Sequence, residues 1–404
     1  MAPIELFSPS ALGLAVMGAA GVYGYRHYID GCRIKIVTCD SKSSAAVRQT
    51  DAEGVVTLRD VLYTECPSLS HPDIAYMVPT LYLATGLLQT IYATMRIRLR
   101  DSSSDVEYTR ELLTMTDGAT LSLDWYEEEA TNAARPIAMV MSGVGGSSHE
   151  HHIRALAKAL ATSPLQIRVV VVNHRGTART PITASRPYDV GFTEDFRGAV
   201  AHVHKENLNC KIIGIGFSMG ANILTKYMGE EGNACPLTCA VTVCCPFDIV
   251  ISGAAMNESN MLNNLVFQPA VMSTLMRALK RAEHMDINPE WGIDKARVRN
   301  AKWLSEIEDE LLVKVNGYKD RTEYYTKSSS ARFVDSITVP YLAINSLDDR
   351  ITPAQGIPVD KFTTNPNIAL ALVPRGGHLG FLTGIPPKIW FIKPILEFIS
   401  AILR

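Results

Sequence analysis

Apolar runs of strand length alternate with amphipathic segments of helix length along most of the chain after about residue 107. The runs that predict strands span residues 108–115, 121–125, 137–141, 167–172, 211–216, 239–244, 340–345 and 368–373. Between them, apolar positions with helical spacing occupy residues 153–161, 193–205 and 221–228. Such alternation is typical of an α/β protein with a mostly parallel central sheet flanked by helices on both faces.

The alternation stops in residues 247–331, where helical patterns at residues 260–280 and 301–312 replace strands. It then resumes and ends in an apolar segment that predicts a helix over residues 389–403. An insertion between two late strands would lie at the carboxyl edge of the sheet, where open α/β sheets bind ligands. We therefore expect a helical lid over about residues 250–332, whose apolar side chains either cover a ligand or only pack the lid on the body.

The N-terminal segment has a different character. No charged residue occurs in residues 6–25, and about 20 uncharged residues can span a bilayer. Arg26 and Lys35 follow, so the positive-inside tendency would leave the rest of the chain on the cytosolic side. We expect residues 1–30 to be a membrane anchor and residues 31–404 to form the folded domain. The alternatives are a core-docking or membrane-surface helix and a cytoplasmic protein.

The chain between this segment and the first predicted strand is weakly patterned. Residues 40–72 contain Ser-rich and Pro-containing stretches, which predict loops on the surface of a larger body. Residues 79–92 are mostly apolar and predict a short helix at the domain surface or at the mouth of a pocket.

Composition narrows the classes of protein that fit this pattern. The chain has 404 residues, of which 47% are hydrophobic and 20% charged, and it can therefore bury a large core. Its formal net charge is −2 without long runs of one sign, so we expect no nucleic-acid partner. The eight cysteines show no CxxC pair and no His/Cys ligand spacing. They predict reduced, buried thiols, and we expect no metal site.

The sequence Gly-Phe-Ser-Met-Gly at residues 216–220 follows a strand-like run and precedes a helical pattern. This context is typical of a nucleophile elbow, in which a strained strand-to-helix turn exposes the hydroxyl of the serine, here Ser218. Gly216 and Gly220 would allow the strand and helix to approach closely. The alternative is a buried serine in an ordinary glycine-rich turn.

A serine hydroxyl is a weak nucleophile at its own pKa, so Ser218 needs a base. His378 lies in the glycine-rich residues 374–380, directly after the last predicted strand. His149 and His174 also follow strands, but they precede the serine in the chain. Because nucleophile elbows of this kind are followed first by the acid and then by the histidine, the chain order favours His378 as the base.

The acid of such a site orients the histidine and stabilises its protonated form. Asp348 and Asp349 both follow the predicted strand at residues 340–345. The register of the following Arg-Ile-Thr-Pro residues favours Asp349 as the acid. Asp348 is then expected to be a turn residue that accepts hydrogen bonds from nearby backbone N–H groups.

Acyl transfer also needs donors for the oxyanion that forms during attack. The N–H of Met219, at the start of the helix after the elbow, is one candidate. The loop at residues 142–150 follows a strand and is rich in glycine, and the N–H of Val144 is our choice for the second donor. A phosphate-binding loop is the alternative for this segment, but it lacks the lysine and the glycine spacing of such loops.

Several further motifs accompany the site residues in the order known from one group of hydrolases. They are Gly86-Leu87-Leu88-Gln89-Thr90, Arg110-Glu111, Asp117-Gly118, Leu123-Asp124-Trp125, Gly146-Ser147-Ser148-His149-Glu150, Asn173-His174-Arg175-Gly176, Gly216-Phe217-Ser218-Met219-Gly220-Ala221-Asn222, Asp348-Asp349 and Gly377-His378-Leu379-Gly380-Phe381. From about residue 79 to the C-terminus, the chain thus resembles one branch of the α/β-hydrolase superfamily. This branch contains the bacterial YheT-type hydrolases, the mammalian alpha/beta-hydrolase domain proteins 1, 2 and 3, and the yeast medium-chain fatty acid ethyl ester synthases/esterases. The chain departs from the branch at Ser142-Gly143, where a His-Gly or Pro-Gly pair is usual, and at Ala221, where a second glycine is usual.

The resemblance implies an α/β-hydrolase fold and a serine hydrolase acting on carboxyl esters of lipid-like medium- to long-chain acyl groups. Acyl transfer from an ester or thioester donor to an alcohol, including a biosynthetic intermediate, is the first alternative. A non-catalytic lipid-binding module is the second. N-terminal membrane attachment occurs among the mammalian members, and no cofactor or metal is implied.

Overall fold

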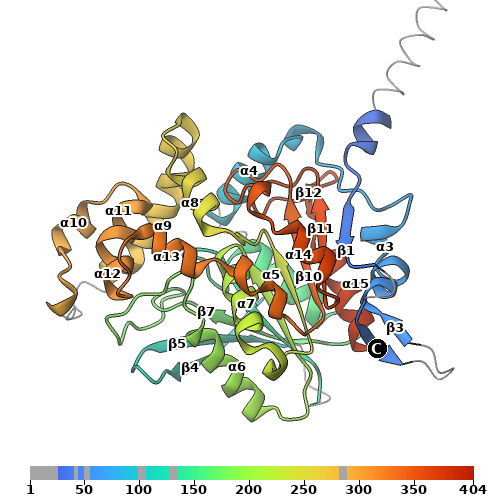
Figure 1. Ribbon diagram of the computed structural model, residues 1–404, viewed down its shortest axis with the longest axis horizontal. Helices are drawn as coiled ribbons and strands as arrows, with labels where there is room; N and C mark the ends of the chain where they lie inside the picture. The colour runs from blue at the N-terminus through green and yellow to red at the C-terminus, as the bar shows by residue number, and fades with distance from the viewer. Residues whose placement is uncertain (1–25, 41–43, 50–54, 99–105, 128–133, 282–288) are drawn as a thin grey trace, which may run out of the picture.

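A nine-stranded sheet forms the centre of the molecule (Figure 1). The structure is a computed structural model that describes residues 26–40, 44–49, 55–98, 106–127, 134–281 and 289–404. In order across the sheet, the strands are β1 (Lys35–Thr38), β11 (Ile368–Val373), β10 (Tyr341–Ser346), β9 (Cys239–Val243), β8 (Ile212–Phe217), β6 (Ile137–Met141), β7 (Arg168–Asn173), β5 (Thr120–Tyr126) and β4 (Thr109–Thr114). The strands from β11 to β7 run parallel, whereas β1, β5 and β4 pair in antiparallel fashion. The predicted mostly parallel sheet is confirmed.

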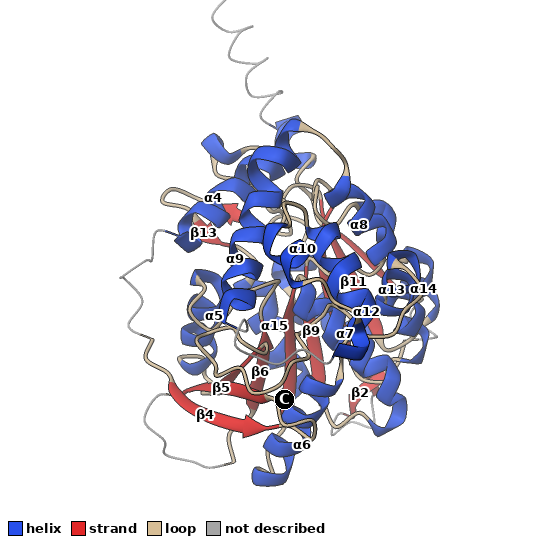
Figure 2. Ribbon diagram, turned by 90° about the vertical axis from the view of Figure 1, so that its left-hand side faces the viewer, coloured by secondary structure: helices blue, strands red, loops and turns tan. Residues whose placement is uncertain are grey.

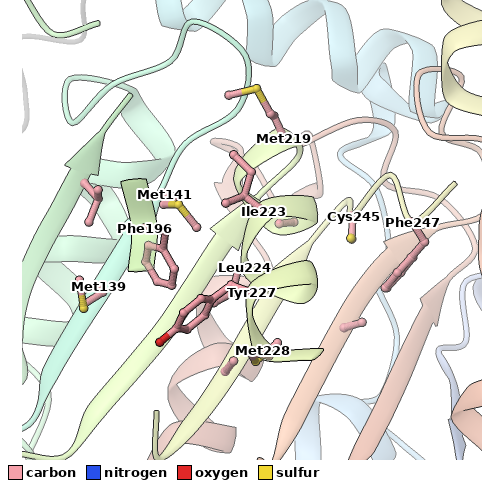
Figure 3. Packing of buried hydrophobic residues seen from close by; sticks show 14 of the residues in the cluster. Met139, Met141, Phe196, Met219, Ile223, Leu224, Tyr227, Met228, Cys245 and Phe247 are labelled. Carbon is pink, nitrogen blue, oxygen red and sulfur yellow. The ribbon is translucent and has the colours of Figure 1, made fainter. Parts of the chain in front are cut away.

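Helices cover both faces of the sheet (Figure 2). The helices α5 (His151–Ala161) and α15 (Ile392–Leu403) pack on one face, and α6 (Glu194–Glu206) and α7 (Met219–Glu231) on the other. The sequence of β6 is apolar throughout because both faces of this strand are buried. Met139 and Met141 belong to the core on the α6–α7 side, while Ala138 and Val140 belong to the core on the α5–α15 side. Figure 3 shows the first of these cores, where Phe196, Leu224 and Tyr227 fill the space between helix and strand.

The insertion at residues 247–331 is helical, and its described part contains no strand. With the turn that follows it, the segment contains α8 (Ile249–Asn257), η4 (Asn263–Phe267), α9 (Gln268–Arg281), η5 (Pro289–Trp291), α10 (Lys295–Asn300), α11 (Leu304–Ile307), η6 (Glu308–Leu312), α12 (Val313–Val315), α13 (Arg321–Ser328) and η7 (Ser330–Ser336). Thr274 of α9 touches Gly145, since a Cβ added to this glycine would lie 2.2 Å from the threonine methyl group. The insertion therefore reaches the carboxyl end of β6, while its role as a lid stays a prediction.

The segment predicted as loops at residues 40–72 is partly regular, so that prediction was wrong in part. It contains β2 (Ala46–Gln49), β3 (Val55–Thr57), α2 (Leu58–Asp60), η1 (Val61–Glu65) and α3 (Pro67–Ser70). A capping box starts α2, because Thr57 accepts a hydrogen bond from the Asp60 N–H and the Asp60 carboxylate accepts one from the Thr57 N–H. Burial of Leu58 and Leu62 then holds these short helices on the body.

The apolar segment at residues 79–92 also differs from the single helix that its pattern predicts. A turn, η2 (Leu81–Leu83), precedes α4 (Gly86–Arg98). The helix starts at Gly86 because the carboxylate of Asp348 accepts a hydrogen bond of 2.7 Å from the Gly86 N–H. The smaller remaining elements are η3 (Gly232–Ala234), η8 (Ala354–Gly356), α14 (Val359–Thr364), β12 (Leu382–Thr383) and β13 (Lys388–Ile389).

The anchor predicted at the N-terminus, with its uncharged residues 6–25, lies outside the described residues. Within the described ranges, no helix combines the length and the hydropathy needed to cross a bilayer.

Candidate active site

Ser218 occupies a strained turn between β8 and α7. Its backbone has φ 51° and ψ −117°, a conformation that side-chain-bearing residues rarely adopt. A Cβ added to Gly216 would lie 2.6 Å from the carbonyl oxygen of Gly220, and one added to Gly220 would lie 2.6 Å from that of Ser142. The two glycines therefore permit the sharp turn from strand to helix, as expected from the sequence.

The three side chains singled out in the sequence meet at this turn. His378 Nε2 lies 2.8 Å from Ser218 Oγ, and His378 Nδ1 lies 2.8 Å from Asp349 Oδ2. The histidines that competed with His378 in the sequence lie elsewhere. His149 packs edge-on against Tyr108, with 6.4 Å between ring centroids. The geometry therefore joins a hydroxyl, an imidazole and a carboxylate in one hydrogen-bonded chain.

The carboxylate of Asp349 is buried but fully engaged in hydrogen bonds. Oδ1 accepts from the N–H groups of Ile351 and Thr352, and Oδ2 accepts from the Thr352 hydroxyl. Burial tends to raise the pKa of Asp349, but the adjacent His378 and these hydrogen bonds outweigh it and hold the pKa below its usual value. Asp349 is therefore ionised at neutral pH and can stabilise a protonated imidazole.

The loop after β6 runs beside the serine hydroxyl. A Cβ on Gly143 would lie 3.6 Å from Ser218 Oγ, and the Gly220 N–H donates to the Ser142 carbonyl oxygen at 3.1 Å. The predicted oxyanion donors are close in sequence to this hydrogen bond: Met219 directly precedes Gly220, and Val144 lies two residues after Ser142. Among the described residues, neither backbone N–H has a hydrogen-bond partner, so both are free to bind a substrate oxygen.

His174 supports this loop. Burial lowers its pKa, although a hydrogen bond to the Ser142 carbonyl partly opposes that effect. Its Nε2 lies 3.1 Å from the carbonyl oxygen, so Nε2 must carry the proton and donate it. The ring also stacks on Tyr188, with 5.3 Å between centroids. The histidine thus holds the loop in place and does not approach Ser218 as a base.

A buried polar network fixes the far end of the same loop. The Asp124 carboxylate accepts from Arg110 at 2.6 Å, from the Ser148 hydroxyl at 2.5 Å and from Asn173 Nδ2 at 2.8 Å. Asn173 Oδ1 in turn accepts from the Ser148 N–H at 3.0 Å. Burial raises the pKa of Asp124, but Arg110 and the other donors outweigh it and lower the pKa. These motif residues therefore form the scaffold of the loop.

Sequence reasoning missed the residues that hold the histidine loop. Asp348 does accept backbone hydrogen bonds, but from distant partners: Gly376 and Gly377 at 2.9 Å each, and Gly86 of α4. Thr90 of α4 accepts from the His378 N–H at 2.8 Å. The Gly86–Thr90 motif was a visible signal, but its partners lie too far along the chain to be inferred from spacing.

One set of possible metal ligands occurs among the described residues. Cys244 Sγ, an oxygen of Asp349 and a nitrogen of His378 all lie within 4.8 Å of one another. Asp349 and His378 are already hydrogen-bonded to each other, and burial raises the pKa of the Cys244 thiol well above its usual value. A protonated thiol is a poor ligand, so these groups are better suited to proton transfer than to metal binding.

Comparison with known proteins places the chain in a family. The model of the alpha/beta hydrolase family matches residues 139–384, and the chain belongs to this family. Phospholipase ABHD3 of Mus musculus is 33% identical over 312 residues, which cover 75% of this chain and 74% of the mouse protein. Medium-chain fatty acid ethyl ester synthase/esterase 2 of Saccharomyces cerevisiae is 28% identical over 391 residues, covering 79% and 84% of the two chains. The solved esterase Pf2001 of Pyrococcus furiosus is 18% identical, with a TM-score of 0.47 and coverage of 73% and 92%.

Proposed function

We propose that the protein is a serine hydrolase that cleaves carboxyl esters of lipid-like acyl groups through an acyl-Ser218 intermediate. The observation that carries this proposal is the continuous chain of 2.8 Å hydrogen bonds from Ser218 through His378 to Asp349 at a strained elbow. A non-catalytic lipid-binding module would need neither the strained serine nor the buried carboxylate behind the histidine.

In the proposed reaction, His378 Nε2 removes the hydroxyl proton as Ser218 Oγ attacks the ester carbonyl carbon. The N–H groups of Met219 and Val144 stabilise the resulting oxyanion. The protonated histidine then gives its proton to the leaving alcohol, and the acyl group stays on the serine. A water molecule, deprotonated by the same imidazole, releases the carboxylic acid and restores the hydroxyl. Asp349 holds the imidazole in the required tautomer throughout.

The relatives support a lipid substrate. The mouse relative is named a phospholipase, and a yeast protein that is 29% identical over 269 residues is named a monoacylglycerol lipase. The insertion at residues 247–331 is suited to an acyl chain, because several of its apolar side chains are exposed, among them Met261 at 73% and Leu265 at 70%. We propose that it acts as a lid over a medium- to long-chain acyl group.

Acyl transfer is a second candidate, since the yeast relative is named both a synthase and an esterase. The acyl-serine can be attacked by an alcohol in place of water, and the imidazole would activate either one in the same geometry. Incubation with a medium-chain acyl ester or thioester and graded ethanol, with ester and free acid followed separately, separates the two outcomes. Ester formed in excess of the bulk alcohol-to-water ratio would support transfer.

We further propose that residues 6–25 attach the protein to a membrane and leave the hydrolase domain on the cytosolic side. The full chain should stay in the pellet after carbonate extraction of membranes. A chain that begins at Arg26 should move to the supernatant and keep its activity on a soluble ester. A full chain that is extracted as readily as the shortened one would contradict the anchor.

The central experiment measures turnover of p-nitrophenyl decanoate. The native protein should hydrolyse it, and Ser218→Ala should lower kcat/KM by several orders of magnitude. Ser273→Ala is the matched control, because this exposed serine lies on α9 and bonds only within its own helix. Equal turnover by the native protein and Ser218→Ala would refute the proposed function.

A further inference from the structure

A pocket lies away from the hydrogen-bonded Ser218–His378–Asp349 chain, between the loop after β7 and the insertion. Its volume is about 120 Å³, and none of these three residues lines it. Its wall comes from loop residues 181–188, from α9 and from α10; the last two belong to the insertion at one end of the molecule (Figure 1). The apolar part of the wall consists of Pro181, Ile182, Pro187, Leu275, Met276, Leu279, Val298 and Leu311.

The charged side chains that line this pocket all carry positive charge. Among the described residues they are Arg175, Arg186, Lys295 and Arg299, and no carboxylate from the described part of the chain lines the pocket. Arg175 is already neutralised, since it contacts Asp117 and Asp195 at 2.6 Å each.

Two of the remaining cations, Lys295 and Arg186, make no close contact with a described carboxylate. Lys295 forms no ion pair with a described residue. The Arg186 guanidinium donates a hydrogen bond to Asn316 and lies 3.9 Å from the centroid of the Phe192 ring. Its nearest described carboxylate, that of Asp189, is 4.0 Å away, and its buried Nε has no hydrogen-bond partner among the described residues. The pocket therefore combines an apolar wall with two cations, Lys295 and Arg186, that no described carboxylate contacts at hydrogen-bond distance, which suits an anion attached to a hydrocarbon chain.

We propose that this pocket binds a single-chain amphiphile with an anionic head. Its aliphatic chain lies against Leu275 and Val298, and its carboxylate or phosphate contacts Lys295 and Arg186. The volume of about 120 Å³ favours part of a single chain, because it is comparable to the cavity of about 150 Å³ that holds one benzene molecule. The rest of a longer chain would lie outside the enclosed space. The burial of methylene groups and the attraction to the cations would then both contribute to the binding affinity of the same ligand.

The pocket also has a wall in common with the oxyanion loop. Tyr188 lines the pocket, and a Cβ on Gly145 of that loop would lie 3.6 Å from the Tyr188 hydroxyl oxygen. Thr274, in the turn of α9 before Leu275, touches the same glycine. An occupant would thus lie one side chain away from the proposed catalytic loop. If the proposed function is correct, the fatty acid released by hydrolysis is one source of such a ligand, and a phosphate-bearing lipid is the other.

Calorimetric titration of the full chain carrying Ser218→Ala tests the proposal without turnover. Decanoate and decyl phosphate, each below its micellar concentration, should both bind, and the tighter of the two identifies the source of the ligand. Butyrate should bind at least about a hundredfold more weakly, because it has far fewer methylene groups to bury than decanoate. Decanol or inorganic phosphate binding as tightly as decanoate would overturn the proposal. Because Ser218→Ala is inactive by design, failure of binding is distinguishable from failure of the proposed hydrolase function.

Variants locate the bound ligand. Lys295→Glu should weaken decanoate binding about three- to tenfold, whereas reversal of charge at Lys302, an exposed lysine outside the pocket, should leave it unchanged. Leu275→Trp fills the pocket and should weaken binding at least about tenfold, whereas Met261→Trp at an exposed position should not. Lys295 is exposed, so its replacement keeps the test valid if Leu275→Trp misfolds. Binding unchanged in Lys295→Glu would overturn the assignment.

Discussion

Asp348 and Asp349 are neighbours in the chain, yet their carboxylates serve different groups. Asp349 holds His378 Nδ1, whereas Asp348 joins the backbone of the histidine loop to the start of α4. The register of the surrounding sequence was enough to choose Asp349 as the partner of His378. The role of Asp348 could not be predicted, because the backbone N–H groups that it accepts from lie 28 to 262 residues away.

Amide substitution distinguishes the two acids. Asp349→Asn should lower kcat by about 10⁴-fold with little loss of stability, because the amide no longer supports the required imidazole tautomer. Asp348→Asn should lower the free energy of unfolding by about 1–3 kcal/mol, because it loses acceptors for buried N–H groups, and should reduce kcat less. Kinetics and urea unfolding of both variants check this. The reverse assignment would follow if Asp348→Asn lost activity as severely as Asp349→Asn at unchanged stability.

Burial shifts the pKa of Glu150, at the end of the loop after β6. Its carboxyl group lies against Gly146, and burial raises its pKa to about 8. The folded state therefore favours the protonated carboxyl, while the unfolded state ionises near its ordinary value of 4.5. Stability from this group is present below pH 4.5 and is lost as pH rises toward 8.

Replacement by the neutral isostere tests this pH dependence. As the pH rises from about 5 to 8, ionisation of the Glu150 carboxyl should lower the free energy of unfolding by up to about 1.4 kcal/mol per pH unit. The variant Glu150→Gln should not show this decrease. Urea unfolding of both proteins across this range measures the difference. Burial also raises the pKa of Glu308 to about 7. This residue is present in both proteins, so its contribution cancels in the difference between their pH profiles. Parallel pH profiles for the two proteins would show that Glu150 is ionised in the folded state.

At the scale of elements, α4 acts as a support for the loop that carries His378. Thr90 accepts from the His378 N–H, and the Gln89 side-chain oxygen accepts from the Leu382 N–H at 2.7 Å. Gly377 has φ 58°, and a Cβ there would lie 2.1 Å from the Gly86 carbonyl oxygen. The helix and the loop therefore fit together only with a glycine at this position and fix the position of the imidazole.

Thr90→Val removes the acceptor and leaves the buried His378 N–H without a partner. It should lower the free energy of unfolding by about 1–3 kcal/mol and reduce kcat more than it changes KM. Thr94→Val is the matched control, since the Thr94 hydroxyl donates only to the Thr90 carbonyl within the same helix. Thermal unfolding and ester kinetics of both variants provide the comparison. Equal effects of the two substitutions would show that the helix does not position the histidine.

The elements that the sequence predicted share a physical feature. Strands such as β6, β8 and β11 are buried on both faces, so their sequences are apolar without interruption and their ends were predicted within a few residues. The elements that were missed, such as β1 and α2, have four and three residues. They depend on distant pairing or on a capping box, so their own sequences carry too little pattern.

At the scale of the whole molecule, the chain order explains why the site could be predicted. The strands β6, β8, β10 and β11 run parallel, so the loops at their carboxyl ends meet at one edge of the sheet. Those loops carry the segment with the predicted oxyanion donor Val144, and they carry Ser218, Asp349 and His378. What could not be predicted is how the remaining chain closes on this edge, because α4 and the insertion are positioned by side-chain contacts between remote segments.

We expect this assembly to make Ser218 a nucleophile. The most direct test is mass spectrometry of the native chain after treatment with a fluorophosphonate probe. We predict one adduct per chain, mapped to Ser218, absent in Ser218→Ala and formed far more slowly in His378→Ala. Failure of the folded native protein to react, or equal labelling of Ser218→Ala, would contradict the account.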